Sequence, residues 1–311
     1  MKNIKILIVG TGAIGSYYGG RLSQAGAEVS ALCRSDYNIV KEKGITIESI
    51  YGNFIFKPHE VINKISDYSE IPDFIIVSTK VLPQINIVDI INEKVGENTS
   101  IVLIQNGIDI EKNIAKSFPN NELISGLAFI CVSRTEPGKV IHQDYGKLSI
   151  GTYPQGISKK TKLLQELFEK ANVKCLADEN IVNSRWQKLV WNAPFNPISV
   201  IGGKLNTAEI LRENTSFNLV KNVMKEIVLL ASNCNITLPS DIINQNLENT
   251  LKMTPYKTSM LLDYENKRPL EVEAILGNAL KIAGDLNLRV PYIESLHALL
   301  LLLDKKNTEN H

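Results

Sequence analysis

At the start of the chain, apolar and polar positions follow the pattern of a strand, a tight turn, a helix and a second strand. Ile4–Val9 is a continuous apolar run, and Glu28–Cys33 is a second run of strand type. Between them lie the glycine-rich Gly10–Gly15 and the helix-like Ala13–Ala25, which stops at Gly26, a residue suited to ending a helix. This succession predicts a βαβ unit with two parallel strands.

More strands and one helix are predicted before the middle of the chain. The expected strands are Phe74–Thr79, Ser100–Ile104, Leu123–Val132, Val140–Ile150 and Val173–Leu176, and the expected amphipathic helix is Lys159–Ala171. The first two of these strands are almost entirely apolar, which is typical of a parallel sheet covered by helices on both faces.

From about residue 178 onward, the hydrophobic spacing becomes helical. One predicted helix face consists of Phe217, Val220, Val223, Met224, Ile227, Leu230 and Ala231. Pro291 stands where a first helical turn tolerates proline. The leucines at 299–303 that follow are expected in the core, with a face for a partner as the alternative. The fold class is therefore α/β, with a Rossmann-type parallel-sheet domain at residues 1–178 and an all-α domain at 179–311.

Composition narrows the classes of function. The 34 Lys and Arg against 33 Asp and Glu give a net charge of +1, which favours neither a nucleic acid nor a membrane partner. The N-terminal apolar run is too short for a signal peptide, and no run approaches membrane-spanning length. The 4 Cys form no CxxC pair and the 4 His are scattered, so we expect no metal site and a reduced, cytoplasmic protein.

The glycine-rich turn matches the G-x-G-x-x-G pattern of dinucleotide-binding proteins. Its members, which we predict to bind the cofactor, are Gly10, Thr11, Gly12, Ala13, Ile14 and Gly15. In such turns the first glycine permits the sharp turn, the second admits the pyrophosphate, and the third allows helix and strand to pack closely. The pattern alone is weak, but its position between a strand and a helix supports a dinucleotide site.

The end of the second strand bears on the choice of cofactor. An acidic residue there binds the ribose 2′-hydroxyl of NAD, whereas arginine accommodates the 2′-phosphate of NADP. Arg34 occupies this place and favours NADP, and Asp36, two residues later, leaves NAD as the alternative.

Two polar residues follow predicted strands directly. Lys80 comes after FIIVST, and Asn106 comes after SIVLIQ. Ligands of open α/β sheets bind beyond the carboxyl ends of the strands, so both residues are placed near a cofactor crevice. Their alternative interpretations are a surface lysine and an ordinary Asn-Gly turn.

A polar stripe marks the start of the helical half. Lys188, Asn192 and Asn196 recur every four residues among Trp, Leu, Val and Phe, so they share one face of a predicted helix. A lysine and two amides on an apolar face need a polar partner, which a ligand would supply. Pro194 and Pro197 are expected to kink or end this helix. The alternative is a solvated helix edge.

If the protein catalyses a reduction, it needs a proton donor, and the chain offers few histidines for this role. His142 lies in a predicted strand and His59 in a predicted loop, and neither is well placed. A lysine serves as an acid when burial lowers its pKa, so Lys188 is the candidate.

Taken together, these motifs resemble the ketopantoate reductase (2-dehydropantoate 2-reductase) family over nearly the whole chain. The resemblance is carried by GTGAIG, Arg34, VSTK ending at Lys80, IQNG around Asn106, WQKLVWNAPFNP, TSMLLD at 258–263, and Glu271 within PLEVEAILG. It implies a Rossmann-type domain followed by a helical domain like that of 6-phosphogluconate dehydrogenase.

The resemblance also implies roles for individual residues. It implies that Lys188 and Glu271 are catalytic, that Arg34, Lys80, Asn106 and Glu271 bind NADP(H) with the glycine turn, and that Asn106, Lys188, Asn192, Asn196, Asn206 and Ser259 bind substrate. The implied reaction is reduction of 2-dehydropantoate to (R)-pantoate by NADPH, in pantothenate and coenzyme A synthesis. Two alternatives stay open: a related NADP-dependent reductase of another small 2-keto acid, and a non-catalytic NADP(H)-sensing module. The sequence allows a homodimer without indicating one.

Overall fold

The computed structural model describes residues 3–309 of the chain, which contain no helix long and apolar enough to cross a membrane. The contacts divide the chain into two compact units. Unit 1 consists of Met1–Lys80, Ile85–Gln105 and Glu111–Val182, and unit 2 consists of Val81–Gln84, Asn106–Ile110 and Asn183–His311.

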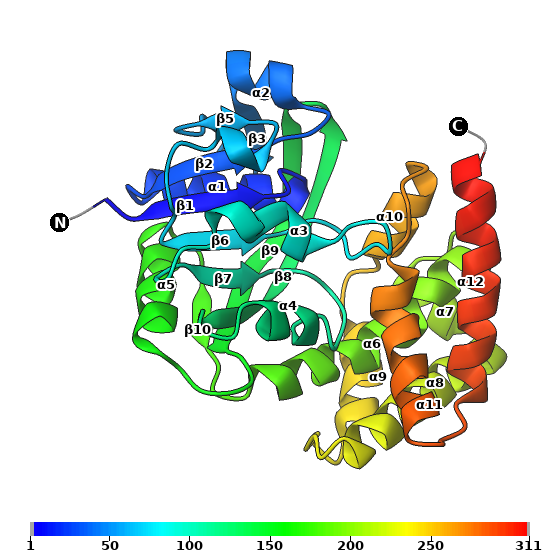
Figure 1. The fold of residues 1–311 in the computed structure, drawn as a ribbon. Helices are drawn as coiled ribbons and strands as arrows, with labels where there is room; N and C mark the ends of the chain where they lie inside the picture. Colours follow the sequence, from blue (N-terminus) through cyan, green and yellow to red (C-terminus); the bar gives the residue numbers. More distant parts are fainter. Residues whose placement is uncertain (1–2, 310–311) are drawn as a thin grey trace. The chain divides into compact units, whose positions relative to one another are not determined.

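Unit 1 is built on one ten-stranded mixed sheet (Figure 1). Its strands are β1 (Lys5–Val9), β2 (Glu28–Leu32), β3 (Ile45–Ser49), β4 (Phe54–Phe56), β5 (Val61–Ile62), β6 (Phe74–Val77), β7 (Ser100–Leu103), β8 (Leu123–Glu136), β9 (Lys139–Thr152) and β10 (Cys175–Ala177). They lie in the order β4-β3-β9-β8-β7-β6-β1-β2-β5, and β10 pairs with β9. Strand β1 therefore has its sequence neighbour β2 on one side and the later β6 on the other, the arrangement that opens a ligand crevice at the strand ends.

The central strands confirm the α/β prediction, and the outer strands correct it. Strands β5, β2, β1, β6, β7 and β8 pair in parallel, as the apolar runs indicate. The pairs β8–β9 and β3–β4 are antiparallel, so the sheet is mixed rather than purely parallel. Strands β3, β4 and β5 escape prediction because they are short and partly exposed.

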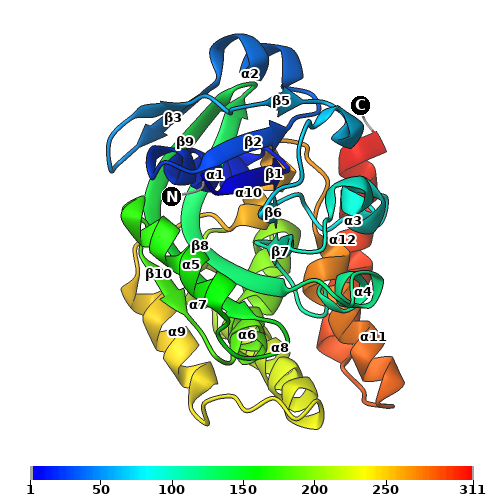
Figure 2. The same cartoon turned by 60° about the vertical axis from the view of Figure 1, so that its left-hand side comes forward.

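Seven short helices and turns accompany the described part of this sheet. They are α1 (Ala13–Gln24), α2 (Tyr37–Lys43), η1 (Ile65–Asp67), α3 (Ile87–Ile91), η2 (Asn92–Lys94), α4 (Lys112–Ser117) and α5 (Lys159–Lys170). Strands β8 and β9 are long and curved (Figure 2), and three irregularities in their register, which are a known source of curvature, interrupt the pairing.

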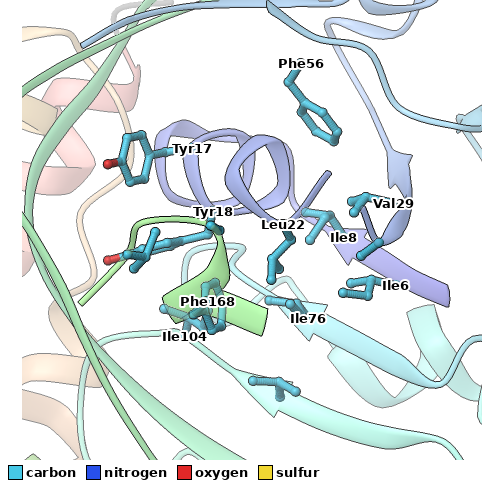
Figure 3. Packing of buried hydrophobic residues seen from close by; sticks show 14 of the residues in the cluster. Ile6, Ile8, Tyr17, Tyr18, Leu22, Val29, Phe56, Ile76, Ile104 and Phe168 are labelled. Carbon is cyan, nitrogen blue, oxygen red and sulfur yellow. The ribbon is translucent and has the colours of Figure 1, made fainter. Parts of the chain in front are cut away.

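The core of unit 1 lies where α1 packs on the sheet. Ile6, Ile8, Leu22 and Ile76 are buried together between the helix and strands β1 and β6 (Figure 3). Gly20 allows β4 to approach the helix, because a Cβ atom at this position would lie 2.7 Å from the ring of Phe54.

Unit 2 is helical. Its helices are α6 (Ile181–Ile201, which begins at the end of unit 1), α7 (Thr207–Arg212), α8 (Asn214–Asn233), α9 (Ile242–Lys252), α10 (Ser259–Glu265), the π-helical turn η3 (Glu273–Gly277), α11 (Asn278–Asp285) and α12 (Pro291–Glu309). The predicted apolar face of α8 is buried from Val220 to Ala231.

Two expectations for these helices need correction. Of the kink or end expected at Pro194 and Pro197, the end is wrong, because helix α6 continues through both prolines to Ile201. The two prolines are fully surrounded by buried neighbours, so packing offsets the loss of two backbone hydrogen bonds. On α12, Leu300 is buried, whereas Leu299, Leu301 and Leu302 are exposed rather than part of the core.

Helix α12 begins with a cap supplied by another helix. Pro291 is its first residue and has no N–H group. The next two N–H groups, of Tyr292 and Ile293, donate to the two carboxylate oxygens of Glu226 on α8 at 3.0 and 2.8 Å. Burial raises the pKa of Glu226, and the two hydrogen bonds offset part of that rise. The carboxylate thus joins α8 to the free N–H groups of α12.

We expect Glu226→Ala to lower the free energy of unfolding by about 2 kcal/mol, because one buried and one partly buried N–H group lose their acceptor. Glu226→Gln keeps one amide oxygen as an acceptor and loses less. Urea denaturation followed by circular dichroism measures both. Lys225→Ala, at an exposed neighbouring position on α8, is the matched control and is expected to change stability by less than about 0.5 kcal/mol. Equal losses in the alanine variants at 225 and 226 would show that the cap contributes nothing.

Candidate active site

The glycine-rich turn follows β1 and is locked against the end of β6. Gly10 has φ +101°, and a Cβ atom there would lie 2.6 Å from the amide nitrogen of Thr79. A Cβ atom on Gly15 would lie 2.2 Å from the carbonyl oxygen of Gly10, which also accepts a hydrogen bond from Ser78 at 2.8 Å. Side chains are excluded at both positions, as close packing of the turn, helix and strands requires.

Gly12 differs from these two glycines. No atom lies within 4 Å of the place where its Cβ would be, and it forms the N-cap of α1 without a side-chain cap. The first turn of α1 therefore presents backbone N–H groups at an open glycine, a geometry that suits an anion such as a pyrophosphate. Thr11 points elsewhere, because its hydroxyl donates to the sulfur of Cys33 at 3.2 Å.

At the end of β2, Arg34 and Asp36 have opposite environments. Arg34 is exposed, whereas Asp36 is only 4% exposed. The Asp36 carboxylate accepts hydrogen bonds from Arg134 at 2.8 Å, from Ser35 at 2.8 Å and from the backbone N–H of Gly138 at 3.2 Å. The carboxylate is thus engaged within unit 1.

The two strand-end residues fall in different units. Lys80 is the half-buried last residue of the first segment of unit 1, and Asn106 opens the second segment of unit 2. The side-chain oxygen of Asn106 accepts a hydrogen bond from the ammonium group of Lys188 at 3.0 Å. The structure therefore brings together Asn106 and Lys188, which were both predicted as site residues.

Arg185, one helical turn before Lys188, holds the same short segment. Its guanidinium donates to the carbonyl oxygen of Gly107 at 3.1 Å, and only 2% of Arg185 is exposed. Gly107 has φ +99°, and a Cβ atom there would lie 2.5 Å from the carbonyl oxygen of Ala274. Sequence reasoning missed Arg185, although its spacing of three residues from Lys188 places it on the same side of the predicted helix.

The environment of Lys188 alters its acidity. The pKa of this lysine is lowered from 10.5 to about 8, chiefly by burial and then by the positive charge of Arg185, while the negative charge of Glu271 acts in the opposite direction. One carboxylate oxygen of Glu271 accepts a hydrogen bond from the backbone N–H of Val81 at 2.9 Å. A lysine whose pKa lies near neutrality is suited to giving up a proton during a reaction.

The other two members of the polar stripe are buried on α6. Asn192 is 8% exposed and Asn196 is 4% exposed. Within residues 3–309, neither side-chain amide has a hydrogen-bond partner. Buried amides are rarely left without partners, so both groups are available to a polar ligand. Between them, Trp191 stacks on Phe195 and on Tyr256, with ring centroids 4.6 and 5.9 Å apart.

Two further predicted substrate residues lie at helix starts. Asn206 is the N-cap of α7, where its side-chain oxygen accepts from the N–H groups of Ala208 and Glu209. Ser259 is the exposed first residue of α10, next to its N-cap Thr258. Asn206 therefore has a clear structural role, which the sequence Asn-Thr-Ala-Glu would have indicated as a capping box.

No group of three or more His, Cys, Asp or Glu side chains in the described residues is arranged to hold a metal ion. Both ring nitrogens of the buried His142 have partners within unit 1, namely Ser49 and the carbonyl oxygens of Asp144 and Tyr145.

Comparison with known proteins confirms the resemblance inferred from the motifs. The family model "Ketopantoate reductase PanE/ApbA" matches residues 6–155, and "Ketopantoate reductase PanE/ApbA C terminal" matches residues 180–304. The chain belongs to the ketopantoate reductase family. It is accordingly an oxidoreductase of that family.

Relatives of the chain cover nearly its whole length. A 2-dehydropantoate 2-reductase of Nostoc sp. is 36% identical over 99% of this chain and 97% of its own. The crystal structure of 2-dehydropantoate 2-reductase from Methylococcus capsulatus is 46% identical, covers 97% of each chain and has a TM-score of 0.91. D-mandelate dehydrogenase in complex with NADH and anilino(oxo)acetate is 23% identical, covers 98% of this chain and 99% of its own, and shares the fold with a TM-score of 0.88.

We expect Arg185→Met to raise the pKa of Lys188 from about 8 toward 10.5, because a neighbouring positive charge is removed. Arg185→Lys keeps the charge and is expected to leave this pKa nearer 8. The measurement is the pH dependence of the Lys188 ¹³Cε chemical shift in lysine-labelled protein, assigned with a Lys188→Met variant. Glu271→Gln, which removes the opposing charge, is expected to lower the pKa further. If none of these variants shifts the titration, the two charges do not control this lysine.

Proposed function

We propose that the protein reduces 2-dehydropantoate to (R)-pantoate with NADPH, a step of pantothenate and coenzyme A synthesis. The observation that carries the proposal is Lys188, a half-buried lysine with a pKa near 8, hydrogen-bonded to Asn106 in a chain of the ketopantoate reductase family. The full-length relatives named 2-dehydropantoate 2-reductase support the choice of substrate.

Unit 1 has the features that a nicotinamide dinucleotide needs. The turn from Gly10 to Gly15, including Thr11, Ala13 and Ile14, would hold the pyrophosphate at the open N-terminus of α1. Arg34 would hold the 2′-phosphate. We assign Lys80 of unit 1, and Asn106 and Glu271 of unit 2, to the nicotinamide half. When bound, NADPH supplies a hydride for the substrate's carbonyl carbon.

Lys188 is proposed as the proton donor. Its ammonium group would donate a hydrogen bond to the substrate's carbonyl oxygen and transfer a proton to that oxygen as negative charge develops on it. A single well-placed donor of this kind contributes about 3–4 kcal/mol to lowering a barrier. With a pKa near 8, Lys188 is still mostly protonated at neutral pH but releases its proton more readily than an ordinary lysine.

Asn106 would orient the proton donor, and Glu271 would adjust its acidity. The Asn106 oxygen accepts one N–H bond of the ammonium group, which restricts its rotation and leaves other N–H bonds for the substrate. The negative charge of Glu271 keeps the lysine pKa from falling further.

Substrate binding is assigned to the amides of α6. Asn192 and Asn196 are buried without a hydrogen-bond partner in residues 3–309, and each offers both a donor and an acceptor to hydroxyl, carbonyl or carboxylate oxygens. Ser259 would contribute a hydroxyl. Asn206 would act through its amide nitrogen, because its oxygen caps α7.

Two finer assignments accompany this function. All four cysteines are free thiols, consistent with our proposal of a cytoplasmic enzyme. The homodimer remains a prediction; a ketopantoate reductase from Staphylococcus aureus that shares the fold at 20% identity is described as dimeric.

The decisive assay is NADPH oxidation with 2-dehydropantoate beside a panel of other small 2-keto acids. We expect the highest kcat/KM with 2-dehydropantoate, because the family and the full-length relatives point to it. A higher kcat/KM with another 2-keto acid would assign the chain to a different substrate. Tight NADPH binding with no turnover on any of them would indicate a sensing module instead.

We expect Lys188→Met to slow single-turnover hydride transfer by about 10²–10⁴-fold, the usual contribution of a general acid. NADPH binding, measured by fluorescence, serves as the control and should persist. In the unaltered protein the reduction rate should fall as pH rises through about 8, since only protonated Lys188 donates. A rate independent of pH over this range, or an undiminished rate in the variant, would remove Lys188 from this role.

A further inference from the structure

The sequence leaves two candidate residues for cofactor choice at the end of β2, and the structure separates them. Arg34 is exposed and free to meet a ligand from solvent, whereas Asp36 is 4% exposed. Both oxygens of the Asp36 carboxylate are used within unit 1, one by Arg134 and Ser35 and the other by the N–H group of Gly138.

The residue that engages Asp36 comes from a distant part of the chain. Arg134 is on β8, 98 residues away, and its guanidinium lies 2.8 Å from the Asp36 carboxylate. Gly138, in the tight turn between β8 and β9, has φ +72° and packs on Ile39 of α2. The tip of the β8–β9 hairpin (green) accordingly lies beside α2 (blue) in both ribbon views (Figures 1 and 2).

The charges at this place depend on Arg134. Arg34, Asp36 and Arg134 together carry one net positive charge, and without Arg134 the sum is zero. A phosphate monoester carries about −2 at neutral pH, so an uncompensated carboxylate two residues from Arg34 would repel it. The same free carboxylate is the group that binds the 2′-hydroxyl in NAD-dependent proteins.

We propose that Arg134 is a specificity-determining residue, which favours NADP(H) over NAD(H) by holding the Asp36 carboxylate away from the ribose site. The proposal rests on the proposed dinucleotide function and extends it to a residue outside the glycine turn and the β2 end. Arg134 acts through Asp36 and needs no contact with the cofactor.

The test measures the affinities of NADP⁺ and NAD⁺ by titration calorimetry, which requires no turnover. We expect Arg134→Met to lower the ratio of NADP⁺ to NAD⁺ affinity by roughly tenfold, because an unpaired carboxylate then faces the phosphate. Adding Asp36→Asn to this variant should restore the ratio to within about threefold of the starting value, since the carboxylate is then absent. Arg34→Ala is the positive control, and its loss of NADP⁺ affinity should not be rescued by Asp36→Asn.

Lys139→Met is the matched control on the same hairpin. Lys139 pairs with Glu48 at 2.9 Å rather than with Asp36. Its replacement changes the net charge by the same amount as Arg134→Met and should leave the ratio unchanged. Should Arg134→Met not fold, Arg134→Gln keeps a hydrogen-bond donor for Asp36 without its charge, and a lowered ratio is still expected.

Three outcomes decide between the possibilities. An unchanged ratio in the Arg134 variants contradicts the inference. A lowered ratio that Asp36→Asn fails to restore shows that Arg134 contacts the phosphate directly, and this also overturns it. If the unsubstituted protein binds neither nucleotide, both this inference and the proposed function fail. If the unsubstituted protein prefers NADP⁺ and Arg134→Met keeps the same preference, only the role of Arg134 is refuted.

Discussion

Two positive charges one helical turn apart on a buried helix impose the main constraint on this molecule. Arg185 and Lys188 repel one another, and neither is well solvated. One short segment supplies hydrogen-bond acceptors to both side chains: the carbonyl oxygen of Gly107 accepts from Arg185, and the side-chain oxygen of Asn106 accepts from Lys188. The lysine cannot move without losing its acceptor, and its proton is held less tightly than in water. The position and the acidity of Lys188 thus follow from the same set of contacts.

The sequence predicts features whose causes are local. The βαβ unit, its glycine turn and the apolar face of α8 depend on residues close together in the chain, and they are found as predicted. Lys188 and Asn106 could be named because each stands in a recognisable pattern, one on a helix face and the other at a strand end. Their mutual contact across 82 residues could not be derived from either pattern alone.

Where the predictions fail, tertiary contacts prevail over local preference. Helix α6 passes two prolines because its neighbours bury that stretch. The short β3 forms because β9 provides an edge to pair with, and β4 in turn pairs with β3. Asp36 shows the same limit at the cofactor end. From its place near the end of β2, Asp36 keeps NAD open as the alternative cofactor, but the arginine that engages its carboxylate lies on a hairpin far along the chain. Asn206 is a different case, since its capping-box pattern was readable in the sequence.

The helical unit is completed by two pieces of chain that are synthesised long before it. Val81 donates to Glu271, Gly107 accepts from Arg185, and the carbonyl oxygen of Ile108 accepts from Asn278. A fragment cut at the start of α6 would therefore contain the apolar core of unit 2 and lack the acceptors for its buried cations. In this chain, the boundary between compact units is therefore not a single boundary along the sequence.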